Sequence, residues 1–600
     1  MSAKDTAIAG ISAGETEVVR VLPAAGALDR EFDYLMPYRL LPGRPASVGD
    51  RVRIPLGPRR VGGWVIAKPA TPATEDLKEV LGWRGLGPSA DLVELSAWAS
   101  WRWAGPRRLF LQAASPPRIV SAAESAREGL AEEAPLPSWA PEGLAEAWEA
   151  RFGIIRVAPG TGRLPYLKAV LAASAGQILV LVPTEAGASA LAAGLRGEGV
   201  SVALLPDGWA MARAGARVIV GTRSAAWAPA GQLGTVVVLD CHDRSWKETR
   251  SPTWEVPALT LERCRRAGAR WIGLSCCPTL ALSSLVGVFT TSRGSERRGW
   301  APLEVVDMTE EDPRNGIVST RLAAIARQAS AASPLAVVYN LKGRARLLGC
   351  SKCKALARCE ACGAALVGSG GDSLSCLRCG LVRPVVCGSC GSTKLATLRS
   401  GVTRLAEQLA LLGVEVSEGE TAAPVMVGTE ALLHRRVRAS VVVMADFDQE
   451  LLRAHFGAAE SALALLGRAS RAVGGRAGRV VVQTRLASHP VLQAAMKADP
   501  EILARSEEPL RRQLALPPFA ALAMVSGEHA EEWLSPLGED VGGGRSGPGR
   551  DGSHGAVELS QIGEGRLVLR AGDTQVLCDA LASLGRRPSG VRVEVDPQAV

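Results

Sequence analysis

Eight of the thirteen cysteines in this 600-residue chain lie within 41 residues, as four Cys-x-x-Cys pairs. One such pair presents two thiolates from a single turn, and two pairs complete a tetrahedral four-thiolate zinc site. The gaps of five, thirteen and seven residues between the pairs hold few large apolar side chains, so the stretch would depend on metal for its folding energy. A disulfide framework is the alternative, but nothing in the chain looks secretory. The sequence therefore predicts two Zn2+ ions per chain, bound by Cys350, Cys353, Cys359, Cys362, Cys376, Cys379, Cys387 and Cys390.

The bulk composition predicts a cytoplasmic, globular protein of several domains. Hydrophobic residues make up 47% of the chain and charged residues 22%, which is typical of folded proteins. The N-terminus has no signal-peptide pattern, and no apolar run approaches the ~18 residues of a membrane span, so we expect no membrane contact. The net charge of +9 favours a polyanionic partner such as nucleic acid.

The hydrophobic pattern changes along the chain. Short apolar runs alternate with turn residues up to about residue 75, which predicts a small β module. Helical spacing around three tryptophans follows, and then an acidic, proline-rich segment that is typical of a linker. Buried strands alternate with helices in two successive series, which predicts two parallel α/β sheets. The first series has strands near Ile154–Val157, Ile178–Val182, Val218–Val220, Val236–Leu239 and Trp271–Leu274, and the second near Leu335–Tyr339, Val425–Val427, Val441–Met444 and Val480–Gln483.

Two consecutive α/β domains suggest a motor with twin nucleotide-binding lobes, but the phosphate-binding loop is altered. The candidate loop, Ala158–Pro165, keeps the turn glycines Gly160 and Gly162. Arg163 stands where a P-loop has lysine, and Leu164 replaces the hydroxyl that binds Mg2+. Arginine is a poor geometric substitute for that lysine, and leucine cannot bind a metal.

The acidic motif that should follow a strand is also incomplete. Asp240 could still hold Mg2+, but the neighbouring carboxylate that would position water is replaced by Cys241. Hydrolysis in such motors depends on positioning and electrostatics, so these losses predict little or no ATP turnover. An ordinary strand-loop-helix turn that never bound ATP is the alternative. Asp240 is at most a vestigial catalytic residue, and Gly160, Gly162 and Arg163 are candidates for nucleotide binding.

Several further segments together make the chain resemble the PriA family of primosomal replication-restart helicases. The resemblance covers nearly the whole length and includes its degenerate actinobacterial members. The matching segments are Leu28–Tyr34, Gly49–Gly57, Gly221–Ser224, Asn340–Gly343, Gly428–Glu430, Arg511–Leu514, Pro517–Phe519 and Val593–Pro597.

The resemblance implies a multidomain α/β fold. It has a β module and a winged-helix-like domain, two RecA-like helicase lobes with an inserted two-zinc domain, and a small α+β C-terminal domain. The expected ranges are 1–80 for a 3′-DNA-binding domain, 81–125 winged-helix-like, 126–148 linker, 149–295 first lobe, 296–349 and 391–505 second lobe, 350–390 zinc insertion and 506–600 C-terminal domain.

The resemblance also implies a nested zinc pairing, which spacing alone leaves open. Cys350, Cys353, Cys387 and Cys390 would form the outer site, and Cys359, Cys362, Cys376 and Cys379 the inner one. Departures from the family pattern concentrate in the helicase motifs, where its SATPS stretch reads Ser275–Thr279. The arginine-finger motif falls near Arg468–Gly474, but its register is ambiguous. The later segment Gly475–Arg479 has a sequence similar to the motif but lies too close to the next strand. We therefore assign no arginine finger.

By the same resemblance, Phe32, Asp33 and Tyr34 would hold the terminal nucleotide of a DNA 3′ end. Alternatively, Phe32 and Tyr34 are core residues and Asp33 lies in a turn. Arg51 and Arg53 would contact phosphate as part of a basic face, or simply be solvated. Trp98, Trp101 and Trp103 are expected in the core of the helical segment, with stacking on DNA as the alternative.

The expected function is a replication-restart primosome protein that recognises stalled forks and recruits the replicative helicase without unwinding DNA itself. The alternative is an active ATP-dependent 3′-to-5′ helicase. The implied partners are fork DNA with a 3′ end, primosome proteins, single-strand-binding protein and the replicative helicase machinery, in a nucleoid-associated cytoplasmic location. Whether ATP and Mg2+ are used is left open.

Overall fold

The structure is a computed structural model of the chain. It describes residues 16–598 apart from 27–28, 70, 72–75, 123–131, 341–347, 354, 356, 358–359, 361–365, 369–372, 377–380, 398–400, 420–422, 435–438, 454, 539–556 and 563–564. Among the described residues, no helix is both long and apolar enough to cross a membrane.

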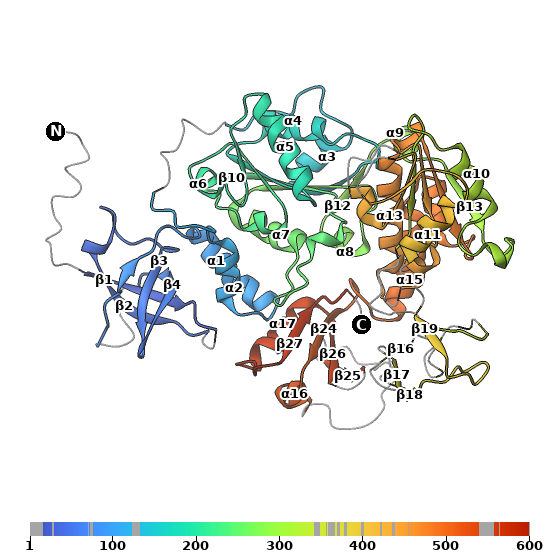
Figure 1. Cartoon of the computed structure of the whole chain (residues 1–600). Helices are drawn as coiled ribbons and strands as arrows, with labels where there is room; N and C mark the ends of the chain where they lie inside the picture. The colour runs from blue at the N-terminus through green and yellow to red at the C-terminus, as the bar shows by residue number, and fades with distance from the viewer. Residues whose placement is uncertain are drawn as a thin grey trace.

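The N-terminal module is an antiparallel sheet followed by two helices (Figure 1). Its strand order is β2-β1-β4-β3-β5, and apolar side chains on one face form the small core. The elements are β1 (Thr16–Pro23), β2 (Phe32–Pro37), β3 (Arg51–Leu56), β4 (Arg59–Ala67), β5 (Gly82–Trp83), α1 (Ala90–Arg102) and α2 (Arg107–Ala114).

The first lobe is a seven-stranded parallel sheet with order β12-β6-β11-β10-β7-β9-β8. Its central strands are buried on both faces, as near-continuous Val/Ile/Leu runs require. The strands are β6 (Phe152–Arg156), β7 (Gln177–Leu181), β8 (Val202–Leu204), β9 (Val218–Gly221), β10 (Leu233–Leu239), β11 (Arg270–Ser275) and β12 (Gly287–Thr290). The helices are α3 (Leu144–Glu149), α4 (Leu164–Ala173), α5 (Glu185–Gly197), α6 (Trp209–Arg213), α7 (Val256–Ala267), α8 (Leu280–Ser283) and α9 (Arg293–Gly299).

The second lobe is a six-stranded parallel sheet with order β13-β23-β22-β14-β21-β20. Its strands are β13 (Leu303–Asp307), β14 (Leu335–Val338), β20 (Val416–Glu418), β21 (Val425–Gly428), β22 (Val441–Met444) and β23 (Arg479–Thr484). Its helices are α10 (Thr320–Gln328), α11 (Gly401–Ala410), α12 (Asp448–Leu451), α13 (Ala458–Ala472), α14 (Pro490–Met496) and α15 (Glu501–Gln513). The predicted strands of both lobes are confirmed, and so is the prediction of two parallel α/β sheets.

The cysteine-rich insertion leaves the second lobe after β14. Its ends pair as antiparallel strands, which brings the two ends of the insertion side by side. The strands are β15 (Leu348–Cys350), β16 (Leu366–Gly368), β17 (Ser373–Cys376), β18 (Val382–Pro384) and β19 (Leu395–Thr397). The C-terminal domain is an α+β unit with β24 (Ala521–Ser526), α16 (Ala530–Gly538), β25 (Glu558–Gln561), β26 (Arg566–Ala571), α17 (Thr574–Ser583) and β27 (Arg592–Val595).

Helices α1 and α2 and the C-terminal domain pack against the first lobe. Trp103, Phe110 and Trp227 pack with tilted rings in one continuous core, so at least Trp103 is a core residue, as expected. The C-terminal domain contacts both the helices and the first lobe: Asp596 pairs with Arg102 of α1, and the buried ammonium of Lys247 in the first lobe donates to the Val595 carbonyl.

The segment predicted as a linker is partly structured. Its described end, from residue 132, carries side chains that pack on the first lobe, and Leu144 and Trp148 of α3 are buried in the core of that lobe. Composition predicted a linker because this stretch is rich in proline and acidic residues, whereas its sparse apolar side chains determine its packing.

Candidate nucleotide site and metal centre

The altered phosphate loop lies between β6 and α4, at the carboxyl end of the first sheet. Arg163 is the residue before α4, and Pro165 lies in its first turn, where a missing N–H costs nothing. The guanidinium of Arg163 folds back over the loop and donates to the carbonyls of Ala158, at 3.2 Å, and Thr161, at 2.8 Å. Leu164, in the place of the metal-binding hydroxyl, is 40% exposed. The loop is therefore held closed by its own arginine.

The end of α9 and the second lobe also contact this loop. The backbone N–H of Gly160 donates to the Gly299 carbonyl at 2.9 Å, so it is not available to a phosphate. A Cβ at Gly160 would lie 3.0 Å from that carbonyl oxygen and 3.3 Å from the Cα of Gly475 in the second lobe. The other glycine of the loop, Gly162, lines an adjoining cavity of about 400 Å³ with Tyr166 and Arg298.

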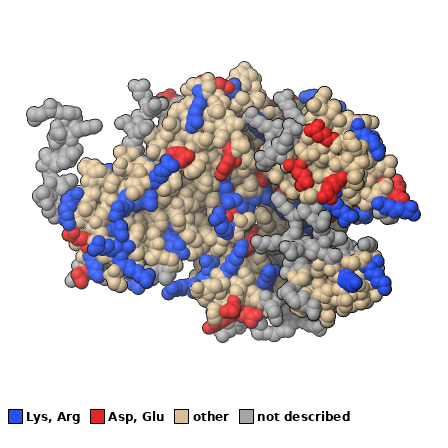
Figure 2. Space-filling model, in the orientation of Figure 1, with Lys and Arg blue, Asp and Glu red and all other residues tan. Residues whose placement is uncertain are grey.

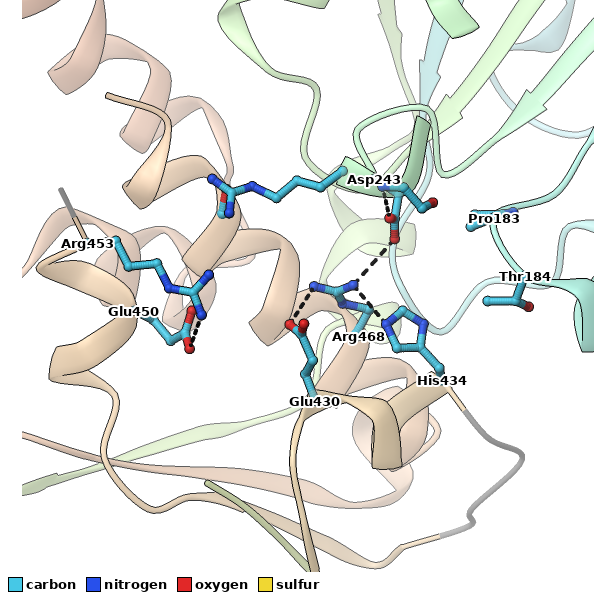
Figure 3. Close-up of a pocket in the computed structure, with 11 residues that line it drawn as sticks. Pro183, Thr184, Asp243, Glu430, His434, Glu450, Arg453 and Arg468 are labelled. Carbon is cyan, nitrogen blue, oxygen red and sulfur yellow. Dashed lines mark hydrogen bonds and ion pairs between the residues drawn. The ribbon is translucent and has the colours of Figure 1, made fainter. Parts of the chain in front are cut away.

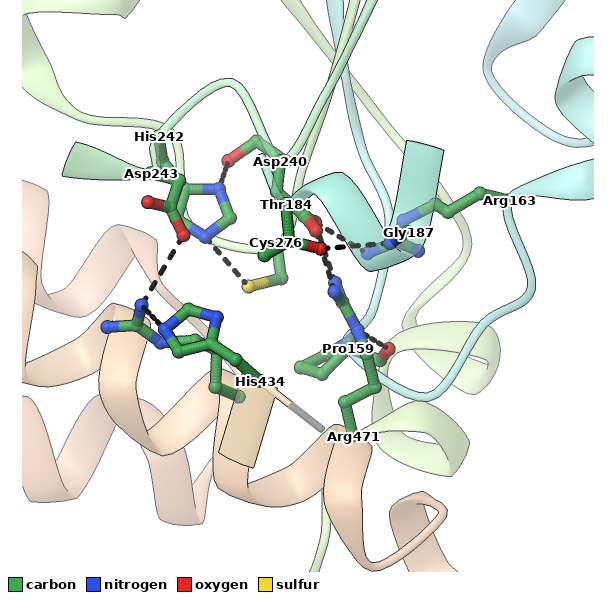
Figure 4. Close-up of polar contacts among 12 residues, drawn as sticks. Pro159, Arg163, Thr184, Gly187, Asp240, His242, Asp243, Cys276, His434 and Arg471 are labelled. Atoms are coloured by element: carbon green, nitrogen blue, oxygen red, sulfur yellow. Dashed lines mark hydrogen bonds and ion pairs between the residues drawn. The ribbon is translucent and has the colours of Figure 1, made fainter. Parts of the chain in front are cut away.

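Asp240 lies directly after β10, in a left-handed backbone conformation with φ of 48° that aspartate tolerates better than most residues. Its carboxylate binds two arginines, one from each lobe (Figure 4). Arg471, at the end of α13, donates to both oxygens at 2.6 Å, and Arg163 donates to Oδ1 at 3.3 Å. Arg471 also donates to the Pro159 carbonyl at 3.1 Å. We call this cluster of Asp240, Arg163 and Arg471 the interlobe latch.

The latch fixes the charge state of Asp240. Burial alone would raise the pKa of this carboxyl, but the charge and hydrogen bonds of Arg471, followed by the charge of Arg163, hold its pKa well below the ordinary range. Burial lowers the pKa of Arg471, and Asp240 more than offsets that effect, so the pKa of Arg471 is raised. Both oxygens of the Asp240 carboxylate are therefore bound by guanidinium groups in this arrangement.

Three further side chains gather beside the latch. His242 follows β10, and Cys276 and Cys277 follow the neighbouring strand β11. The nitrogen and sulfur atoms of these three residues lie within 4.8 Å of one another. Cys241 is buried apart from them, in the core of the first lobe, where burial raises the pKa of its thiol.

A cleft of about 330 Å³ opens on the same interlobe boundary (Figure 3). Arg468 of α13 lies between Asp243 of the first lobe, at 3.4 Å, and Glu430 of the second, at 3.6 Å. Its guanidinium also contacts the His434 ring at 3.1 Å. The two arginines of α13, Arg468 and Arg471, thus both bind acidic residues of the first lobe.

The four predicted outer cysteines come together in the insertion. The Sγ atoms of Cys350 and Cys390 are 3.6 Å apart, as are those of Cys353 and Cys387, and all four lie within 4.8 Å. The N–H of Cys353 is the main cause that lowers the pKa of the Cys350 thiol to about 6, and the N–H groups of Ser389 and Cys390 lower the pKa of Cys387. Four thiolates in this arrangement suit zinc. The side chains of all four predicted inner cysteines lie outside the described residues; these are Cys359, Cys362, Cys376 and Cys379.

The predicted DNA-end residues lie on β2. The Asp33 carboxylate is 2% exposed and pairs with Arg20 on β1 at 2.8 Å. Tyr34 is buried in the module core, and its hydroxyl donates to the Pro55 carbonyl. This position matches the alternative in which Tyr34 is a core residue. Phe32 is half-buried, with the Arg30 guanidinium 5.6 Å from its ring centre.

The predicted basic face is on β3 and β4. Arg51 is half-buried and within 3.4 Å of the Pro116 carbonyl, whereas Arg53, Arg59 and Arg60 are exposed. Figure 2 shows Lys and Arg side chains gathered over this module. The surface therefore offers positive charge to a polyanion.

The chain has two lobes, each built on a parallel sheet, which meet at the position of a phosphate-binding loop. A β module precedes them and a cysteine-rich insertion lies within the second. This arrangement is that of a helicase-like protein. Residues 18–116 match the PriA 3′BD family, described as a 3′DNA-binding domain. The chain is 29% identical over 573 residues to the probable replication restart protein PriA of Mycobacterium tuberculosis, across 83% of this chain and 85% of that protein. It is 26% identical over 372 residues to the replication restart protein PriA of Haemophilus influenzae, across 55% and 51%.

The chain is therefore similar to PriA proteins over most of its length, and the predicted resemblance is confirmed. Among solved structures, S. cerevisiae Dbp5 bound to RNA and ADP BeF3 aligns with a TM-score of 0.34 and 12% identity, over 61% of this chain and 89% of that chain.

The sequence analysis did not predict that Arg471 of the second lobe binds Asp240 of the first. The later segment Gly475–Arg479 begins as a 3-10 turn and leads into β23, so its arginines lie outside α13. The three-residue spacing of Arg468 and Arg471 could have indicated a shared contact surface, because it places both side chains on one face of a helix.

Proposed function

We propose that this protein recognises DNA forks with a 3′ end during replication restart and recruits the replicative helicase without ATP-driven unwinding. Its partners are fork DNA, primosome proteins, single-strand-binding protein and the replicative helicase machinery. The N-terminal module supplies DNA binding, and the helicase-like lobes serve as a rigid scaffold.

The interlobe latch is the observation that carries this proposal. A phosphoryl-transfer motor needs a free carboxylate and a hydroxyl for Mg2+, and a lysine for the phosphates. Here the carboxylate of Asp240 binds Arg163 and Arg471, and Leu164 stands in place of the hydroxyl. A motor must also open and close its lobes in each cycle, which the latch opposes by joining them.

The N-terminal module supports the DNA-binding part of the proposal. Its match to a 3′DNA-binding domain and its exposed arginines suit a polyanion that presents a strand end. In this proposal Asp33 accepts a hydrogen bond from the terminal nucleotide, and Arg51 and Arg53 contact phosphates.

The insertion supports the recruiting part. We propose that Cys350, Cys353, Cys387 and Cys390 bind one zinc ion and that Cys359, Cys362, Cys376 and Cys379 bind a second. Metal would supply the folding energy of this segment, whose described residues form a small apolar cluster around Leu366 and Leu374. A metal-stabilised insertion of this kind offers a surface to other proteins.

A fork-binding assay tests the proposal. Full-length protein is titrated against labelled forks whose nascent strand ends in a 3′-hydroxyl or a 3′-phosphate, with and without Mg2+ and ATP. We expect tighter binding to the 3′-hydroxyl fork and the same affinity with and without ATP. Binding that requires ATP, or equal binding to both ends, would contradict it.

A further inference from the structure

The cluster of His242, Cys276 and Cys277 has no part in the proposed function. It lies at the carboxyl ends of two hydrogen-bonded parallel strands, β10 and β11, where the first lobe faces the second. The exposed fractions of Cys276 and Cys277 are 2% and 5%. Buried thiols beside an imidazole are a donor set that soft or borderline metal ions prefer.

The distances in the cluster match those around a single zinc ion. The Nε2 of His242 lies 3.7 Å from the Sγ of Cys276, and the two Sγ atoms lie 3.7 Å apart. Tetrahedral bonds of ~2.3 Å to sulfur and ~2.0 Å to nitrogen separate two sulfurs by about 3.8 Å and nitrogen from sulfur by about 3.5 Å. The Sγ spacing is also close to the 3.6 Å of the four-cysteine group in the insertion.

Ser275 orients both kinds of donor. Its Oγ lies 2.9 Å from Nδ1 of His242 and accepts from the N–H of Cys277 at 3.1 Å. When Nδ1–H donates to that hydroxyl, the lone pair of Nε2 faces the thiols. A histidine ligand fixed through its other nitrogen is the usual outer-shell arrangement at metal sites.

The second lobe leaves room for the cluster. Gly467 of α13 packs against Cys276, and a Cβ at that position would lie 2.8 Å from its Sγ. Charge also favours a divalent ion, because one such ion with two thiolates and a neutral imidazole forms a neutral unit. A neutral unit can be buried beside the net positive interlobe latch without a further counter-ion.

We propose that His242, Cys276 and Cys277 bind one zinc ion at the interlobe boundary, separate from the cysteine insertion. Three protein ligands leave the fourth position to solvent. The ion joins the ends of β10 and β11 directly under α13, and therefore stabilises the surface of the first lobe that the second lobe contacts.

Metal counting on the full-length chain tests this site. Protein is loaded with zinc under anaerobic, reducing conditions, and loosely bound ions are removed before zinc per chain is measured. We expect the double variant Cys276→Ala/Cys277→Ala to hold one zinc fewer than wild type. The matched control is Cys264→Ala, which removes another buried thiol of the same lobe, and it should hold the wild-type amount.

A second measurement keeps the test decisive if the double variant folds poorly. With cobalt in place of zinc, His242→Gln should change the ligand-field spectrum and lose the nitrogen contribution in X-ray absorption, while the thiolate contribution persists. Equal zinc in wild type and the double variant, or a cobalt spectrum that His242→Gln leaves unchanged, would overturn the proposal.

Discussion

Replacing Asp240 by asparagine should loosen the contact between the two lobes. The substitution keeps the size of the side chain but removes the charge to which Arg163 and Arg471 bind. The two guanidinium groups would then repel each other across the boundary. We therefore expect local opening at the start of α4 and the end of α13.

The expected magnitude follows from burial. Removing one partner of a buried ion pair costs ~3–5 kcal/mol. The side chain of Asp240 is 13% exposed but that of Arg471 is 41% exposed, so solvent screens part of the interaction. We expect about 2 kcal/mol, which corresponds to a roughly 30-fold larger open fraction.

Hydrogen–deuterium exchange measures this opening segment by segment. The matched control is Asp207→Asn, on the same lobe, because the Asp207 side chain is 81% exposed and lies 4.0 Å from Arg118. Faster exchange in α4 and α13 for Asp240→Asn alone would support the latch. Exchange no faster than in the Asp207→Asn protein would refute it.

Three further predictions concern pH, metal and DNA. Burial, followed by the charges of Arg244, Arg453 and Arg511, lowers the pKa of His455 to about 4. As the pH falls, His455 is therefore protonated in the unfolded chain before it is protonated in the folded protein. The free energy of unfolding should fall as the pH drops from ~6.5 towards 4. Denaturant unfolding at about pH 7.5 and about pH 5 should show this loss in wild type and a smaller one in His455→Gln. The variant Cys350→Ser/Cys387→Ser should lose one zinc and protection from protease in the insertion, whereas Cys578→Ala should keep both. Asp33→Asn should reduce the preference for a 3′-hydroxyl fork about tenfold in equilibrium binding, and an undiminished preference would exclude Asp33 from end recognition.

The parallel sheets could be predicted because their strands are short apolar runs that must be buried on both faces. Leu179 and Val237 illustrate this, since both are buried, with exposed fractions of 0% and 1%. Edge strands such as β12 and β20 were not predicted, because half-exposed strands lack such runs.

The lack of a metal-binding side chain at Leu164 could also be predicted from a single position, since leucine cannot bind metal in any fold. The latch could not, because Arg471 and Asp240 are 231 residues apart and meet only when the lobes pack. The same holds for His242 and Cys276, which depend on β10 and β11 being neighbours in the sheet. Sequence spacing gives local chemistry, and the order of the strands determines which local groups meet.

ATP hydrolysis by the full-length, zinc-loaded protein on fork DNA is the most direct test of the central claim. We predict no DNA-stimulated turnover above background, and no change when Asp240 is replaced by alanine. DNA-stimulated hydrolysis that Asp240→Ala abolishes would show that Asp240 holds Mg2+ in a working motor, and would contradict the account.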